Sequence, residues 1–514
     1  MFDFVSDDPL NICVLYDERS TFTKTVYEHL NAFKRYSRHQ VFYLPASSSW
    51  AVPENTIDDV FDLNIFDVII THYSIRHCLD WHFSEPLVRK LVAYEGLKIA
   101  FIQDEYDLAE HTRGMFERIG YNIVYTCVPE DGRQLVYPAE RFPRTAFLPT
   151  LTGYVPEDPA LESATVPMAE RAVRIAYRGR ELPAVYGLLG REKWRIGVEM
   201  KRLAAERGVL VDIEVDDARR IYGSDWYRFL GSARATLGTE SGANVFDDDG
   251  SLRAAVDAAQ AREPDVAFDE LHRRFVAPHE GRVRMNQVSP KIFEAMRLRT
   301  ALVLFEGEYS GVVVPERHYI PLRKDLSNAD EVFARLEDLN YLETLTARAY
   351  DECIASGRYS YRAFVEGIER DIAANLPSRR RATLFAVPVA VRAADGAIRF
   401  VAPTHPAGFA LTSSILSDDL QREQMAAGVE ARLPAALLLR LQTRSKRTRM
   451  LGALWRMLPV SLRAGLRTRA QVFLDTAGQA PEKSGLAFRA VRMLWRNVVP
   501  QSVRHRLQTI LRSC

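Results

Sequence analysis

The sequence predicts an α/β fold of two Rossmann-like domains facing a cleft, followed by a basic helical C-terminal extension. Three observations predict it. The 514 residues exceed what one ordinary core accommodates. Short apolar runs bounded by turn residues alternate with helical patterns, which is typical of βαβ units and a parallel sheet. A second series of such runs starts after a segment rich in proline, glutamate and alanine.

These patterns divide the chain into five parts. Residues 1–155 form a first Rossmann-like domain, 156–171 an interdomain linker and 172–377 a second Rossmann-like domain. Residues 378–434 are mixed in composition, with an extended run at 383–392, and their fold is not assigned. Residues 435–514 form a basic helical tail with three helical patterns.

The first domain is expected to contain strands and helices in alternation, because apolar runs and amphipathic patterns follow one another from its start. The expected strands are 11–16, 40–44, 66–71, 98–103 and 122–127, followed by a further segment at 146–149, and the expected helices are 22–36, 87–94 and 108–119.

The second domain repeats this order, with a charged helical segment that reads as an insertion. The expected strands are 173–177, 209–215, 235–238, 301–305 and a short one ending at Ile320. The expected helices are 194–207, 226–233, the insertion within 251–278, 290–297, 330–336, 342–356 and 361–374.

Charge is distributed unevenly along the chain. The net charge is +1, which gives no whole-chain indication of a nucleic-acid partner. From Ala435 onward there are sixteen basic residues and two acidic ones, and an apolar stripe runs beside the arginines of the last helical pattern. Such a segment suits an anionic membrane surface or an acidic partner helix. A helical hairpin packed on the main body with its arginines in water is the alternative.

The cysteines and the N-terminal sequence indicate the cellular compartment in which we expect the protein. The five cysteines show no CxxC spacing or paired pattern, which argues against a zinc site and a disulfide framework and favours a reducing compartment. The N-terminus has no basic segment followed by a long apolar one, and no window approaches the length of an apolar spanning helix. We therefore expect a cytoplasmic protein, with any membrane contact peripheral and on the inner face.

The stretch from Val288 to Leu322 carries the most specific motif. It reads S-P-K-I-F-E-A from Ser289 to Ala295 and continues into an apolar strand, and an earlier strand ends in the turn Gly179-Arg180. With the two Rossmann-like halves, this resembles the GT-B glycosyltransferases, and more narrowly the bacterial group-1 retaining enzymes and their divergent relatives. The resemblance covers residues 11 to about 375.

The resemblance implies an activity. Such a protein would move a sugar from a nucleotide-diphosphate sugar to a glycan, lipid-linked or protein acceptor, in envelope or surface polysaccharide assembly, without a metal or other cofactor. The donor would lie against the second domain and the acceptor against the first. A non-catalytic double-Rossmann module that binds a nucleotide sugar or a partner is the alternative. A sugar-nucleotide epimerase is less well supported, because no GxGxxG follows the first strand.

The donor residues are expected around the motif. The family's glutamate that binds the ribose corresponds to Glu294, and a carboxylate can accept from two vicinal hydroxyls at once. Ser289 and Lys291 stand where the loop opens the helix, whose free N–H groups and partial positive charge suit a diphosphate. The alternative is that Glu294 is an ordinary surface helix residue. Asn286 stands where the family often has a second glutamate.

Two cationic residues are candidates for binding the leaving diphosphate. Arg180 matches the family's glycine-arginine turn, and Lys193 is the nearest downstream lysine. Cations there would offset the charge that develops as the glycosidic bond breaks, unless they belong to a solvated basic face. Ser241, in the loop 239–244, is a further candidate for contact with the donor, whereas Asp247 to Asp249 reads as a turn and not as a metal site.

Acceptor chemistry is expected at two strand ends of the first domain. Gln103, Asp104 and Glu105 follow the fourth strand, and His72 follows the third in a pattern similar to one in the family. Carboxylates there could bind an acceptor hydroxyl or act as a base. The alternatives are an N-cap for the next helix and a structural histidine.

Overall fold

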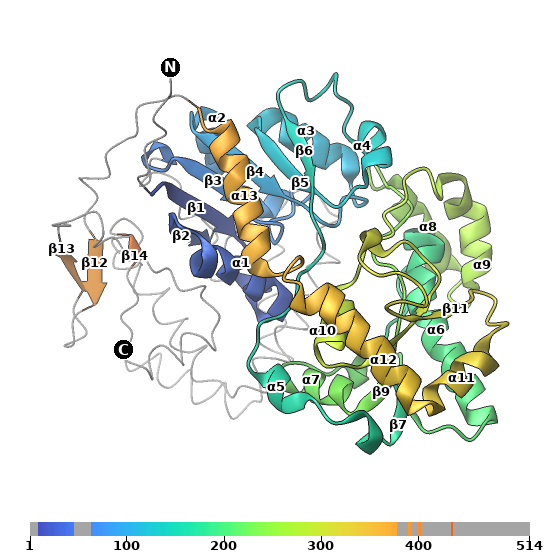
Figure 1. Ribbon diagram of the computed structural model, residues 1–514. Coiled ribbons are helices and arrows are strands. Elements are labelled where there is room, and N and C mark those ends of the chain that lie inside the picture. Colours follow the sequence, from blue (N-terminus) through green and yellow to red (C-terminus); the bar gives the residue numbers. More distant parts are fainter. Residues whose placement is uncertain (1–8, 46–62, 378–388, 393–397, 402–432, 435–514) are drawn as a thin grey trace, which may run out of the picture. The chain divides into compact units, whose positions relative to one another are not determined.

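The computed structural model describes residues 9–45, 63–377, 389–392, 398–401 and 433–434 (Figure 1). The predicted tail helices lie outside these residues. Within 378–434, the described part is a small antiparallel sheet, which includes the end of the extended run predicted at 383–392. Its strands are β12 (Val389–Arg392), β13 (Ile398–Val401) and β14 (Leu433–Pro434).

The first domain is a six-stranded sheet in the order β2-β1-β3-β4-β5-β6, with every neighbouring pair parallel. This confirms the predicted α/β class. The strands are β1 (Asn11–Tyr16), β2 (Gln40–Pro45), β3 (Val68–Thr71), β4 (Leu97–Phe101), β5 (Ile123–Thr126) and β6 (Ala146–Pro149).

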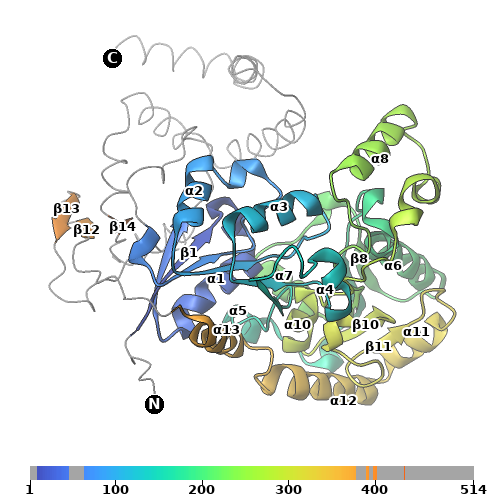
Figure 2. The same ribbon diagram turned by 90° about the horizontal axis from the view of Figure 1, so that it is seen from above.

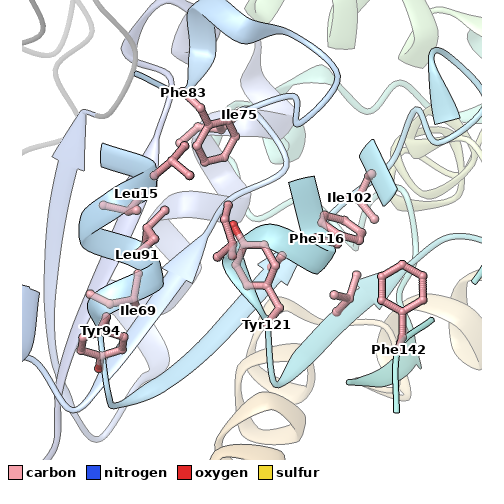
Figure 3. Close-up of a cluster of buried hydrophobic side chains, with 14 of the residues drawn as sticks. Leu15, Ile69, Ile75, Phe83, Leu91, Tyr94, Ile102, Phe116, Tyr121 and Phe142 are labelled. Carbon is pink, nitrogen blue, oxygen red and sulfur yellow. The ribbon is translucent and has the colours of Figure 1, made fainter. Parts of the chain in front are cut away.

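Helices α1 (Lys24–Tyr36), α2 (Glu85–Ala93), α3 (Ala109–Ile119) and α4 (Glu130–Val136) connect these strands (Figures 1 and 2). Figure 3 shows one apolar core of the domain, in which Leu15 and Ile69 from the sheet pack with Leu91 of α2 and Phe116 of α3. Each of the four residues has 1% or less of its surface exposed. The burial of such residues from water is the main force that holds helix to sheet.

The second domain has five parallel strands in the order β11-β10-β9-β7-β8. The strands are β7 (Val173–Arg178), β8 (Val211–Glu214), β9 (Ala233–Gly238), β10 (Ala301–Phe305) and β11 (Ile320–Leu322). The helices are α6 (Gly187–Glu206), α7 (Ser224–Gly231), α8 (Ser251–Arg262), α9 (Phe268–Leu271), α10 (Pro290–Arg297), α11 (Ala329–Glu337) and α12 (Leu339–Tyr350). The linker contains the short helix α5 (Ala160–Ala164).

Two predicted boundaries in this domain are wrong. Helix α6 begins at Gly187, seven residues before the predicted start, because the half-buried carboxylate of Glu280 accepts from Leu188 N at 3.1 Å and fixes the first turn. Strand β11 begins at Ile320, where the predicted strand ended. The apolar run before it includes the buried Val312 and Val313, which pack in a loop and not in the sheet.

Helix α13 (Tyr361–Asn375) lies beside α1 in both views (Figures 1 and 2) and belongs by its packing to the first domain. Phe364 joins the core that β1 and α1 form. Ser37 Oγ and Arg38 N donate to Glu369 at 2.6 and 2.9 Å. The predicted second domain, which ends at 377, therefore includes a helix that stabilises the first.

The two domains also meet through a shared carboxylate and a loop. Asp107, after β4, accepts hydrogen bonds from Arg76 of its own domain and from Arg253 and Tyr186 of the second. Met285 of the second domain packs in the core of the first. None of the described helices is both long enough and apolar enough to cross a membrane.

Candidate functional site

Basic side chains gather where β7 ends. Arg178, the last residue of the strand, pairs with Asp212 at 2.8 Å and lies over the ring of Phe229. Gly179 follows, and a Cβ there would approach Lys193 O to 2.8 Å, so only glycine lets the strand end lie this close to α6. Arg180 is exposed and forms no ion pair or hydrogen bond with the described residues. The predicted glycine-arginine turn thus presents one uncommitted guanidinium.

Two lysines lie within electrostatic reach of Arg180. Lys193, on α6, has its pKa lowered to about 8 by burial and, in smaller part, by Arg180, against the opposing effect of Asp104. Its ammonium donates to Ser241 Oγ at a long 3.4 Å. Lys291, in the first turn of α10, also has its pKa lowered to about 8, chiefly by loss of hydration. The structure therefore brings the predicted residues Arg180, Lys193, Ser241 and Lys291 together.

Lys291 is exposed, and its ammonium has polar, aromatic and charged neighbours. Its ammonium donates to Arg178 O at 2.9 Å and lies 5.2 Å from the ring centroid of Trp226. Lys193, Arg220 and Arg180 each lower its pKa further, while Glu294 raises it. Like charges that crowd together destabilise one another. A bound anion would relieve that repulsion, and the amino terminus of α10, which Ser289 precedes as N-cap, adds its partial positive charge.

Glu294 is the acidic member of the site. It lies on α10 with 8% of its surface exposed, and its Oε2 accepts from Trp226 Nε1 at 2.7 Å. Burial raises its pKa, against the opposing effects of Trp226 and Lys291. Its other oxygen has no hydrogen-bond donor among the described residues. Glu294 is therefore not an ordinary surface residue, since one oxygen is oriented and the other is free for a ligand.

Glu28 is a residue that sequence reasoning missed. It lies half-buried on α1 of the first domain, and its pKa is raised to about 8, mainly by burial and in part by Glu294. The nearby Lys24 pairs instead with Asp158 at 2.7 Å. Glu28 itself forms no hydrogen bond or ion pair with the described residues. Position 28 carries no local signal, because its proximity to Glu294 arises only when the two domains meet.

The loop 239–244 is mainly structural. Glu240 accepts from Glu308 N at 2.6 Å and from Tyr309 N at 3.2 Å, which anchors the loop after β10. Asn244 Nδ2 donates to Asn286 Oδ1 at 3.0 Å. The carboxamide at position 286 is thus engaged within the protein, and Ser241 is the member of the loop that contacts the cations.

Two predicted acceptor residues lie at a pocket of the first domain. Gln103 and Asp104, after β4, line a pocket of about 230 Å³. Gln103 Nε2 donates to Thr152 O at 3.2 Å, and the exposed Asp104 accepts from Tyr106 Oη at 2.8 Å. Asp104 also acts electrostatically on Lys193. One lining residue of the pocket is therefore within electrostatic reach of one of the cations.

The other two predicted acceptor residues occupy structural positions. Glu105 is 1% exposed and accepts from Thr126 Oγ1, Tyr137 Oη and Cys127 N, and its pKa is raised to about 7 by burial, against these hydrogen bonds. His72 is fully buried, bonded to Ser74 and to His29. Burial holds the pKa of His72 well below its usual value. Both side chains are enclosed and hydrogen-bonded within the first domain, which favours a structural position over the catalytic role predicted for them.

The aspartates that follow β9 cap a helix. Asp247 accepts from Gly250 N at 2.9 Å and from Arg253 N at 2.9 Å, and Asp249 accepts from Ser251 N at 2.9 Å. These bonds satisfy free N–H groups at the start of α8, as the predicted turn requires. Among the described residues, no group of three or more His, Cys, Asp or Glu side chains could hold a metal ion.

No protein-family model and no curated protein sequence matches the chain. Its structural neighbours are glycosyltransferases. They include an α-glucosyltransferase in complex with UDP and a 13-mer DNA, with TM-score 0.43, 9% identity, and coverage of 72% of this chain and 100% of that one. Anabaena HepE in complex with UDP and glucose has TM-score 0.40, 8% identity, and coverage of 71% and 100%. AviGT4, involved in avilamycin A biosynthesis, has TM-score 0.34, 12% identity, and coverage of 71% and 97%. Because these similarities are low, the chemistry of this chain has to be argued from its own residues described above.

Proposed function

We propose that this protein is a glycosyltransferase that moves a sugar from a nucleoside-diphosphate sugar to an acceptor hydroxyl. The observation that carries the proposal is the group of cations Arg180, Lys193 and Lys291 beside the half-free carboxylate of Glu294. A nucleoside diphosphate presents two charged phosphates next to a ribose with vicinal hydroxyls. The cations suit the phosphates, and the free oxygen of Glu294 suits the hydroxyls.

The same residues supply a route to catalysis. As the glycosidic bond breaks, negative charge grows on the leaving diphosphate. Arg180, Lys193 and Lys291 are already in place beside one another, so they stabilise that charge with little rearrangement of the protein. Asp104 lies on the acceptor side, within electrostatic reach of Lys193. It is the carboxylate best placed to orient the attacking hydroxyl.

Binding is tested first, by thermal shift with a panel of UDP, GDP, ADP and dTDP and their sugar conjugates, since a ligand of the folded state raises Tm. Lys291→Ala and Glu294→Ala should each abolish most of the shift. The matched control is Lys201→Ala, because Lys201 lies on the same domain but pairs with Glu214 at 3.0 Å on the exposed side of α6. Absence of any shift across the panel would contradict the proposal.

Turnover separates this proposal from a non-catalytic binding module. The engagement of Asn286 by Asn244 favours the module, because the position of the family's second glutamate then offers no carboxylate to the sugar. Donor hydrolysis and transfer should be measured for the wild type and for Glu294→Ala. Tight binding of a donor without any turnover would favour the module.

We further propose, from the sequence alone, that the acceptor belongs to envelope or surface glycan assembly and that the basic tail of residues 435–514 brings the enzyme to an anionic membrane surface or an acidic partner. A protein lacking 435–514 should partition less to vesicles that contain anionic lipids. Unchanged partition would remove the membrane role.

A further inference from the structure

The pocket of the first domain has features that select a class of ligand. It opens at the carboxyl ends of β3 and β4, the edge of a parallel sheet where ligands bind in open α/β folds. Its volume of about 230 Å³ exceeds several-fold the roughly 30 Å³ that a water molecule occupies. Ile75 and Ile102, which Figure 3 shows in the apolar core, also line the pocket. The pocket is therefore a ligand-sized recess with an apolar base.

An exposed aromatic ring stands at this pocket. Phe22, at the end of the short 3₁₀ helix Glu18–Phe22, lines it with 79% of its surface exposed. Tyr73 lines it as well and is held by ring contacts with His72 and His29. The face of an aromatic ring is electron-rich and attracts C–H groups that carry partial positive charge. A sugar ring presents such C–H groups on its faces and hydroxyls at its edge.

The charges of the pocket disfavour an anionic ligand. Arg76 lines it, but its guanidinium is paired with Asp107 at 2.9 Å. His77 is uncharged at neutral pH, because burial lowers its pKa to about 3. Among the ionisable residues that line the pocket, Asp104 is exposed and has no cation in direct contact with its carboxylate. Among the residues that line the pocket, the exposed charge is therefore negative, and it would repel a phosphate or a carboxylate that entered.

We propose that this pocket binds a neutral saccharide, with the ring against Phe22 and a hydroxyl hydrogen-bonded to Asp104. The inference rests on the proposed function in treating this saccharide as the acceptor. Because Asp104 lies within electrostatic reach of Lys193, a hydroxyl held by Asp104 would be near one of the cations that would hold the donor. The assignment excludes a polyanionic acceptor such as DNA at this pocket.

The test uses the full chain and saturation-transfer NMR, with and without a saturating nucleoside diphosphate. The probes are the methyl glycosides of glucose, galactose, mannose and N-acetylglucosamine, with the methyl glycoside of glucuronic acid and a short DNA duplex as anionic counterparts. At least one neutral glycoside should bind. Phe22→Ala should weaken it by roughly tenfold, the size expected when a contact of about 1.4 kcal/mol is lost. Phe22→Trp, which keeps a ring, should restore binding.

The control is Trp81→Ala, which removes another exposed ring of the same domain that does not line the pocket. It should leave saccharide binding unchanged. Since Phe22 is exposed, its substitution should not change Tm, and this separates a binding defect from misfolding. The inference is overturned if no neutral glycoside binds, if binding survives Phe22→Ala, or if the glucuronide or the DNA competes better. Failure of the proposed function would show instead in the nucleotide panel, with saccharide binding intact.

Discussion

Binding of a nucleoside diphosphate should be accompanied by proton uptake at Lys193 and Lys291. Each lysine has a pKa of about 8 in the free protein, against an ordinary value of 10.5. At pH 8 each is therefore roughly half deprotonated. A dianionic ligand favours the protonated form and returns both pKa values towards 10.5. Uptake at pH 8 should then be about one proton per ligand bound, and close to none at pH 6.

The sign of the pH dependence follows from this uptake. Because binding consumes protons, affinity is constant while both lysines are already charged and falls as pH rises through about 8. Between pH 8 and pH 9 the dissociation constant should rise by roughly tenfold or more. Glu28, whose pKa is also about 8, would contribute uptake of the same sign if the ligand approaches it.

The assay is isothermal titration calorimetry at pH 8 in two buffers that differ in ionisation enthalpy, with the best-binding nucleoside diphosphate. The difference in observed enthalpy measures the number of protons. Lys291→Arg keeps the charge but does not titrate in this range, so it should remove about half of the uptake and flatten the pH profile. No uptake at pH 8, affinity that increases with pH, or a Lys291→Arg profile equal to that of the wild type would refute the reasoning.

Three further predictions concern carboxylates and one buried arginine. Glu28→Gln should raise the Tm more at pH 8 than at pH 5, because the wild-type carboxylate, with its pKa raised to about 8, disfavours the folded state increasingly as pH rises from the ordinary value of 4.5 to about 8; partial exposure limits the gain to about 1–2 kcal/mol, and a gain that is equal at pH 5 would contradict it. Glu105→Ala should destabilise the protein by about 2–5 kcal/mol in urea unfolding, because it leaves buried donors unpaired, while nucleotide affinity below the transition stays within twofold. Arg171 is 2% exposed and donates to the carbonyls of Val166, Ala233 and Leu298, so Arg171→Met should lower the unfolding free energy by about 3–5 kcal/mol. A loss below 1 kcal/mol would show that these bonds do not hold the linker to the second domain.

Local patterns were sufficient for most elements near the donor site. Helix α10 and strand β10 lie where the sequence predicts them, residue for residue. Proline at the first helical position and a continuous apolar run are signals that neighbouring residues alone produce. Arg180 and Lys291 were identifiable because one follows a strand and the other opens a helix, where a parallel sheet collects its loops. Lys193 was identifiable only as the nearest lysine downstream of the glycine-arginine turn.

Polar residues at strand ends were less predictable. Gln103, Asp104 and Glu105 follow the same strand, yet Asp104 is exposed at a pocket and Glu105 is 1% exposed. The chain turns here, with Glu105 N donating to Gln103 O at 2.7 Å, so that neighbouring side chains differ in burial. Composition at the strand end cannot decide which carboxylate is enclosed, because Thr126 and Tyr137, which enclose Glu105, come from other elements.

The sequence by itself determined the α/β class, the two series of βαβ units and the loop-to-helix unit from Ser289 to Phe305, since hydrophobic periodicity and turn chemistry are local. The tertiary structure decided which residues of the two domains meet. It placed α13 on the first domain, where Phe364 completes a core, and it brought Glu28 towards Glu294 and Asp104 towards Lys193. These proximities depend on how apolar faces from distant segments pack, and the sequence pattern shows that such faces exist but not which partner each one covers.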